Sequence, residues 1–229
     1  MKDPFRLIDL THALSQAVPS WDGSCGFTTE LLWDYETCTT DTKFRVQKIN
    51  MLAGLGTHMD APAHCIPKGL SIADIPLKQL VTTCVVIDVS YKMHETYQVT
   101  PEDIEKFEQQ HGMVEEGMFV IIHTGWEQFW HRPEKYRNNL VFPTISKEAA
   151  ALLLTRNING LGIDTLSPDR PANEYPVHQL VLGAGKYIIE NVANALLMPP
   201  RGAYVLALPI KIAGGTEAPV RLVGLHVGG

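Results

Sequence analysis

The sequence lacks a long apolar run and a basic cluster, and each absence excludes a class of protein. No stretch is apolar over the roughly 20 residues that a membrane-spanning helix needs. The 19 basic residues are outnumbered by 25 acidic ones, which gives a formal net charge of -6. Because phosphate groups are bound by a concentrated basic surface, this balance argues against nucleic-acid binding. We therefore expect neither a membrane nor a nucleic acid as a partner.

Paired cysteine motifs are also missing. The four cysteines, Cys25, Cys38, Cys65 and Cys84, are scattered and form no CxxC motif. The first ten residues alternate charged and hydrophobic side chains, which is not the pattern of a secretory signal peptide. Cysteines in a chain without an export signal are typically reduced thiols and not a disulfide framework. The sequence therefore predicts free thiols and a cytoplasmic location.

The length and composition are those of an ordinary globular domain. A chain of 229 residues with 45% hydrophobic and 19% charged residues can bury one large core. No low-complexity linker, repeat or charge block divides it. We therefore expect a single domain over residues 1–229.

Short apolar runs alternate with helical patterns along the chain. Runs rich in β-branched and apolar residues predict buried strands at Thr83–Val89, Met118–His123, Gly160–Ile163, Tyr204–Pro209 and Val220–Val227. Helices are predicted after the Thr100–Pro101 cap, over Ser146–Arg156 with Ser146 as cap, and over Tyr187–Leu197. The first 60 residues are rich in strands and turns. This pattern predicts an α/β protein with a mixed sheet.

The densest group of potential metal ligands lies in the segment from Gly56 to His64, which reads GTHMDAPAH. His58 and Asp60 are two residues apart, so on an extended backbone both side chains project from one face. An imidazole nitrogen beside a carboxylate oxygen is half of a zinc or manganese site. Pro62 would turn the chain and place His64 over the same cavity, free to move protons. The alternative is an ordinary hydrogen-bonded pair of His58 and Asp60 in a turn.

A second polar cluster runs from Glu174 through His178 to Glu190. Gly183 and Gly185 allow close packing or a positive φ just before the predicted helix over Tyr187–Leu197. Glu190 stands among apolar neighbours, where a buried carboxylate needs a partner or a metal ion. The alternative is that Glu190 lies on the solvated side of an amphipathic helix.

Several of these motifs together resemble the cyclase superfamily, which includes bacterial kynurenine formamidase and isatin hydrolase. The signature of that family is HxGTHxDxPxH, and the chain matches it from Gly56 to His64. The resemblance runs nearly end to end and includes Ile8–His12, Pro19–Gly23, Thr124–Trp126, Gly162–Ser167, Pro176–His178, Glu190–Asn191 and Pro209–Pro219. A chance match to all of these segments is improbable.

The resemblance implies a metal site with four ligands. His58 corresponds to a ligand of the first metal ion and His178 to a ligand of the second. Asp60 and Glu190 correspond to carboxylates that bridge the two ions. The resemblance thus implies Zn or Mn, with one or two ions per protomer.

The resemblance also implies an activity, a fold and an assembly. His64 corresponds to the catalytic acid/base, and Trp21 to an aromatic wall of the substrate pocket. The implied enzyme is a metal-dependent amidohydrolase of the arylformamidase or cyclase kind. It would hydrolyse a carbon–nitrogen acyl bond in a small aromatic substrate such as N-formylkynurenine or isatin. The implied fold is a swivelling β/β/α-type domain with a mixed sheet or barrel-like core and flanking helices, assembled as a homodimer or homotetramer.

One position departs from the signature. The first histidine of the family pattern falls on Gly54, which offers no ligand. The site then holds one metal ion through Asp60, His178 and Glu190, or two ions with water or substrate completing the first, or a neighbouring side chain substitutes. Cys65 is the nearest soft donor, although adjacency to His64 in sequence does not aim both side chains at one point. The second hypothesis for function is a degenerate relative that binds metal or a small ligand without turnover.

Overall fold

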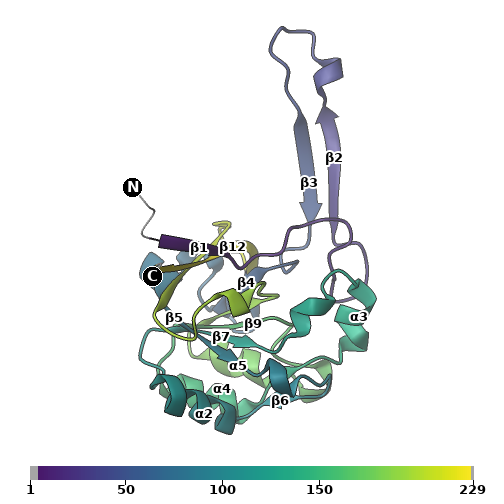
Figure 1. The fold of residues 1–229 in the computed structure, drawn as a ribbon. Coiled ribbons are helices and arrows are strands. Elements are labelled where there is room, and N and C mark those ends of the chain that lie inside the picture. Colours follow the sequence, from purple (N-terminus) through teal and green to yellow (C-terminus); the bar gives the residue numbers. More distant parts are fainter. Residues whose placement is uncertain (1–4, 228–229) are drawn as a thin grey trace.

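Seven strands close into a barrel in the computed structural model, which describes residues 5–227 (Figure 1). Parallel pairing joins β5, β7, β9 and β10, and antiparallel pairing joins the other strands. The ring closes because β12 pairs with both β11 and β4, and β1 extends the sheet beside β12. The strands in ring order are β12 (Glu217–Val227), β11 (Ala203–Pro209), β5 (Val81–Asp88), β7 (Phe119–His123), β9 (Gly160–Ile163), β10 (Tyr187–Glu190) and β4 (His58–Asp60), with β1 (Phe5–Asp9) outside it. The predicted α/β class with a barrel-like mixed sheet is confirmed.

Helices α2, α4 and α5 cover one side of the barrel, beneath β5, β7 and β9 (Figure 1). Side chains of the central strands alternate, so Val86 and Ile121 belong to the inner core while Val85 and Val120 pack toward the helices. Ser146 caps α4 by accepting a hydrogen bond from the Ala149 amide, as the sequence predicts. The helices are α1 (Leu77–Leu80), α2 (Pro101–His111), α3 (Pro133–Arg137), α4 (Lys147–Thr155) and α5 (Pro176–Gly183). In the described part of the chain, no helix is long and apolar enough to cross a membrane.

The inner core receives side chains from every strand of the ring except β9. That strand has Gly160 and Gly162 at the corresponding positions. The stacked rings of Phe119 and Tyr187, with centroids 5.6 Å apart, take up this space. A Cβ on Gly160 would lie 2.7 Å from Tyr187, so the two glycines are required by packing and not by backbone conformation.

The prediction of a helix over Tyr187–Leu197 is wrong. Residues 187–190 form the strand β10, which is followed by irregular chain and a short 3₁₀ turn at Ala195–Leu197. Asn191 and Asn194 both adopt positive φ, at 57° and 55°, which a continuous helix does not allow. A short apolar run with helical spacing fits a buried strand equally well, and here pairing with β9 and β4 decides the outcome. Gly183 and Gly185 therefore lie at the end of α5 and in the turn that leads into strand β10.

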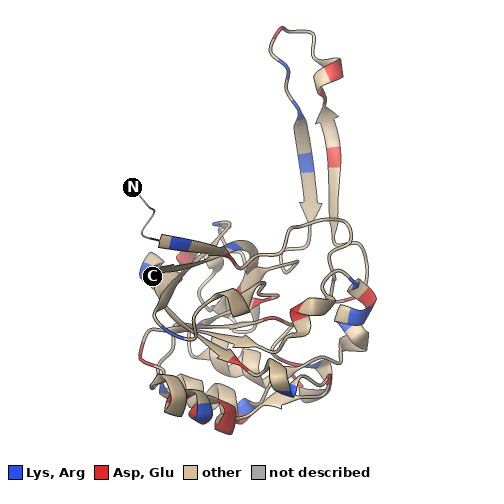
Figure 2. Cartoon of the chain, viewed as in Figure 1, with Lys and Arg blue, Asp and Glu red and all other residues tan. Residues whose placement is uncertain are grey.

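A two-stranded arm projects away from the barrel (Figure 1). It consists of β2 (Phe27–Trp33) and β3 (Val46–Met51), which form a sheet of their own. Figure 2 shows that most of both strands is uncharged. The large apolar side chains exposed on the arm are Leu31, Leu32, Trp33, Tyr35, Phe44 and Ile49. Two further short strands, β6 (Gln98–Val99) and β8 (Thr144–Ile145), pair beside α2 and α4.

Candidate metal centre

The outer face of strand β4 carries the first two predicted ligands. Met59 points into the inner core, so His58 and Asp60 on either side of it project outward. Glu190 of β10 pairs directly with His58, and residues opposite each other on antiparallel strands share a face. The register therefore places His58, Asp60 and Glu190 side by side, and all three are buried.

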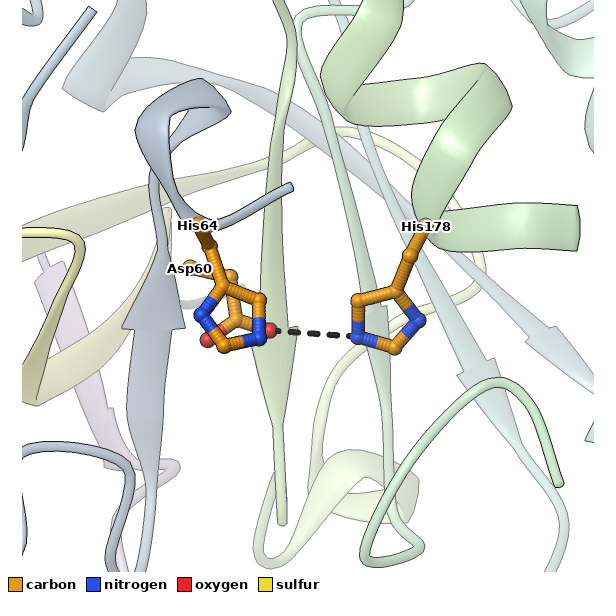
Figure 3. Close-up of side chains that lie close together, drawn as sticks. All are labelled: Asp60, His64 and His178. Carbon is orange, nitrogen blue, oxygen red and sulfur yellow. Dashed lines mark ion pairs between the residues drawn. The ribbon is translucent and has the colours of Figure 1, made fainter. Parts of the chain in front are cut away.

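Helix α5 supplies the fourth predicted ligand from above this face. Pro176 is the first residue of the helix, where its missing N–H has no partner to lose. Asp169 accepts hydrogen bonds from the backbone N–H groups of Val177 and His178, at 3.1 and 2.9 Å. The same carboxylate accepts a bond from His178 Nδ1 at 2.8 Å. His178 is thereby held with Nε2 turned toward Asp60, as Figure 3 shows.

The four side chains form two adjoining sets of donor atoms. His58 Nε2 lies 3.4 Å from Asp60 Oδ1 and 3.4 Å from Glu190 Oε2. His178 Nε2 lies 3.5 Å from Asp60 Oδ2 and 3.3 Å from Glu190 Oε1. Each carboxylate thus directs one oxygen to each imidazole. The two carboxylates therefore lie between the two imidazoles, with oxygens available on both sides.

Backbone groups fix the orientation of His58. The carbonyl of Gly56 accepts a hydrogen bond from His58 Nδ1 at 2.9 Å, which leaves Nε2 free for a ligand bond. Asn191 donates to the same carbonyl at 2.8 Å and accepts from the Tyr136 hydroxyl at 2.9 Å. His58 is therefore supported by a buried network behind it, in the way His178 is supported by Asp169.

The charges of the four groups are strongly interdependent. Burial alone would lower the pKa of His58, but the Asp60 and Glu190 carboxylates raise it to about 10. Burial is likewise overcome at His178, whose pKa is raised well above its usual range by Asp169, Asp60 and Glu190. Burial would raise the pKa of Asp60, but the imidazoles of His58 and His178 lower it. The pKa of Glu190 is raised by burial and by the negative charge of Asp60. The site is built to hold positive charge between carboxylates.

This donor set fits a divalent metal ion. Asp60 Oδ1 is buried and has no hydrogen-bond partner among the described residues. Donor atoms of His58, Asp60 and Glu190 lie within 4.8 Å of one another, and so do those of Asp60, His64 and His178. Imidazole nitrogen with carboxylate oxygen is a ligand combination that Zn²⁺ and Mn²⁺ accept. An ion would supply the partner that Asp60 lacks.

The donor atoms line a cavity of about 630 Å³. His64 lies on the 3₁₀ turn Pro62–His64 that follows β4, and its ring centroid lies 6.0 Å from that of His178, with the Asp60 carboxylate close to both rings (Figure 3). Trp21 lines the cavity at 38% exposure, with its ring 6.3 Å from that of Tyr175. All six site residues predicted from the sequence therefore reach one cavity, including Glu190, which is buried on a strand and not on a solvated helix face.

Three polar residues of the site were not identified as such from the sequence. Asp169 holds His178 and the start of α5 through its hydrogen bonds to both. Asn191 supports Gly56 from behind. Glu217 lines the cavity and lies 3.5 Å from His64. The sequence carries a signal for Glu217, which is an acidic residue within the Pro209–Pro219 segment that resembles the family.

Comparisons with known proteins agree with this architecture. A family model described as "Putative cyclase" matches residues 8–170. The kynurenine formamidase of Salinibacter ruber is 28% identical over 222 residues, covering 95% of this chain and 96% of the relative. Isatin hydrolase A from Labrenzia aggregata, solved with benzyl benzoate, has a TM-score of 0.87 at 31% identity, covering 98% of this chain and 95% of that chain. A structure described as a "potential metal-dependent hydrolase with cyclase activity" has a TM-score of 0.77 at 25% identity, covering 98% and 100%. The resemblance that the sequence motifs indicated is confirmed.

Proposed function

The chain belongs to the family described as "Putative cyclase", and on that premise we propose that it is a metal-dependent hydrolase of a carbon–nitrogen acyl bond. The observation that carries the proposal is the pair of buried carboxylates, Asp60 and Glu190, each placed between the Nε2 atoms of His58 and His178. These four residues would hold Zn²⁺ or Mn²⁺, with one or two ions per protomer. When bound, the ion supplies Lewis-acid chemistry, polarising a carbonyl oxygen and acidifying water.

His64 is the proposed proton carrier. The Glu217 carboxylate, 3.5 Å from His64 Nδ1, raises the pKa of His64, an effect that burial opposes. In its protonated state the ring would donate a proton to the leaving nitrogen. In the deprotonated state the same ring can take a proton from the attacking water. Its place beside Asp60 and His178, on a turn at the edge of the cavity, lets one group serve both steps.

Aromatic side chains support a small aromatic substrate. Trp21 and Tyr175 form one wall of the cavity, and the Trp21 ring also meets Phe142 edge-on at 6.4 Å. Such rings stack on planar ligands. An aryl formamide such as N-formylkynurenine, or a lactam such as isatin, matches both this wall and the substrates named in the relatives.

The test is hydrolysis of these two substrates by protein loaded with Zn²⁺ or Mn²⁺. We expect turnover, and we expect His64→Ala to reduce kcat by about 10²–10⁴-fold, the usual contribution of general acid–base catalysis. His94→Ala is the matched control, because His94 is exposed and bonds to Thr96 away from the cavity. Metal binding without turnover would instead support the non-catalytic relative. Turnover unaffected by His64→Ala would refute the role of His64.

We also propose that the chain forms a homodimer or homotetramer through the β2–β3 arm. A two-stranded ribbon is marginally stable alone in water, and this one exposes Trp33 at 64% and Ile49 at 60%. A second copy offers an equally apolar arm to cover it. Light scattering on the wild type should give a multiple of the protomer mass, and Trp33→Glu with Ile49→Glu should give the protomer. A monomeric wild type refutes this assembly.

The cytoplasm remains the proposed compartment. All four cysteines have free thiols, and Cys25 and Cys65 are exposed, which suits a reducing environment.

A further inference from the structure

The space beside Gly54, which lies in the turn between β3 and β4, is occupied by a carboxylate from strand β12. A Cβ placed on Gly54 would lie 2.1 Å from Glu217 Oε1 and 3.3 Å from His58 Nε2. Both atoms therefore border the position from which a side chain at 54 would start. Any side chain at 54 has to compete with the carboxylate of Glu217 for this space.

Strand register explains why Glu217 reaches this point. Glu217 is the first residue of β12 and pairs with Asp60 of β4, while its neighbour Ala218 pairs with Met59 and belongs to the inner core. Glu217 therefore projects outward from the barrel on the same face as Asp60. Its side chain is 25% exposed, so it lies at the wall of the cavity and not free in solvent.

The two carboxylate oxygens of Glu217 lie near different residues of the site. Oε2 lies 3.5 Å from His64 Nδ1, and Oε1 borders the Gly54 position next to His58. We propose that Glu217 is a ligand of the metal position shared by His58 and Asp60, and that it replaces the imidazole that Gly54 cannot provide. We do not assign this role to Cys65, because Glu217 and His58, and not Cys65, border the space beside Gly54.

The replacement changes the chemistry of the site. With Glu217, the candidate donors become three carboxylates and the imidazoles of His58 and His178, with one imidazole exchanged for a carboxylate. Oxygen-rich sites suit Mn²⁺ and Mg²⁺, whereas imidazole-rich sites suit Zn²⁺. The exchange therefore shifts the metal preference of this chain toward Mn²⁺ relative to a site with histidine at 54.

The test is a double-mutant cycle at positions 54 and 217, with metal affinity as the readout. Chelator-stripped protein is titrated calorimetrically with MnCl₂ and separately with ZnCl₂. We expect Glu217→Ala to weaken Mn²⁺ binding by about 100-fold. This is the upper end of the loss in metal affinity seen when a residue that only supports a ligand is removed. Glu217→Gln, which keeps the shape and removes the charge, should also weaken it. Thermal melts of the metal-free proteins verify that each variant is folded.

The second half of the cycle uses Gly54→His. The far end of the flexible Glu217 side chain has to move and His58 Nε2, 3.3 Å from the new Cβ, has to shift slightly, so the imidazole should displace the carboxylate and take its place. In the Gly54→His background, Glu217→Ala should then have little further effect on metal affinity. The ratio of Zn²⁺ affinity to Mn²⁺ affinity should be about 10-fold or more higher in the Gly54→His/Glu217→Ala double variant than in the wild type. Cys65→Ala and Glu30→Gln, on the arm, are the controls and should bind like the wild type.

Two results would overturn the inference. One is equal loss from Glu217→Ala with glycine or histidine at 54, which would mean that the two positions are independent. The other is loss from Glu217→Ala that disappears in a His64→Ala background, which would make Glu217 a positioning residue for His64. The inference rests on the metal dependence in the proposed function, but the readout is binding. Failure of hydrolysis and failure of this inference are therefore distinguishable.

Discussion

Replacement of Asp169 by asparagine probes how the structure orients His178, which we propose as a metal ligand. Asp169 is buried and its carboxylate accepts three hydrogen bonds, two from backbone N–H groups at the start of α5 and one from His178 Nδ1. An asparagine has one acceptor oxygen, so its amide NH₂ must face at least one of these N–H donors. It also removes a negative charge from the N-terminus of a helix.

The size of the effect follows from these losses. One buried donor left without a partner costs about 1–3 kcal/mol. The lost charge at the helix N-terminus adds about 0.3–1 kcal/mol. Together they predict a loss of roughly 1–4 kcal/mol in the free energy of unfolding of the metal-free protein. For a chain of this size that corresponds to a fall in Tm of roughly 2–16 °C. Metal affinity should fall by about 10–100-fold, because a partner that orients a ligating imidazole is lost.

The assay combines thermal melts in chelator with calorimetric titration of Mn²⁺. Asp74→Asn is the matched control, since Asp74 also accepts bonds from a backbone N–H and a hydroxyl at Ser71 but is exposed and remote from the donor atoms. It should leave metal affinity unchanged. An Asp169→Asn protein with the Tm and the Mn²⁺ affinity of the wild type would refute the role assigned to this carboxylate.

Three further predictions concern stability. Burial opposes ionisation of Asp103, but its ion pair with Lys92 lowers its pKa below the unfolded value; the stabilisation is therefore present above about pH 4 and lost as the pH falls through the folded pKa. Between pH 7 and pH 3 the free energy of unfolding, measured with denaturant, should fall less steeply for Asp103→Asn than for the wild type. Equal slopes against pH for the two proteins would contradict this. Gly160→Ala should lose about 1–3 kcal/mol by crowding the Tyr187 ring, whereas Gly183→Ala, with ordinary contacts, should stay within about 0.5 kcal/mol. Saturating the metal-free protein with Mn²⁺ at 100 times its Kd should add about 2.7 kcal/mol of stability, and an unchanged Tm would argue against the metal site.

Local patterns in the sequence were sufficient for much of the fold. The buried strands at β5, β7, β9 and β11 and the capped helices α2 and α4 were predicted near their observed bounds, because runs of β-branched residues and caps act over a few residues. The predicted helix over Tyr187–Leu197 failed because its apolar spacing is compatible with both states. Contacts with strands β9 and β4, far away in sequence, select the strand.

The candidate site divides in the same way. The sequence alone determined that His58 and Asp60 share one face, because side chains alternate along any extended strand, and it placed His64 on a turn beyond Pro62. It could not determine that Glu217 stands beside Asp60 or that Asp169 holds His178. Those contacts depend on the register of β4 against β12 and on where α5 packs against the barrel. Register and packing are fixed only when distant segments bury their apolar faces together, so the tertiary structure decided which carboxylate lies beside Gly54.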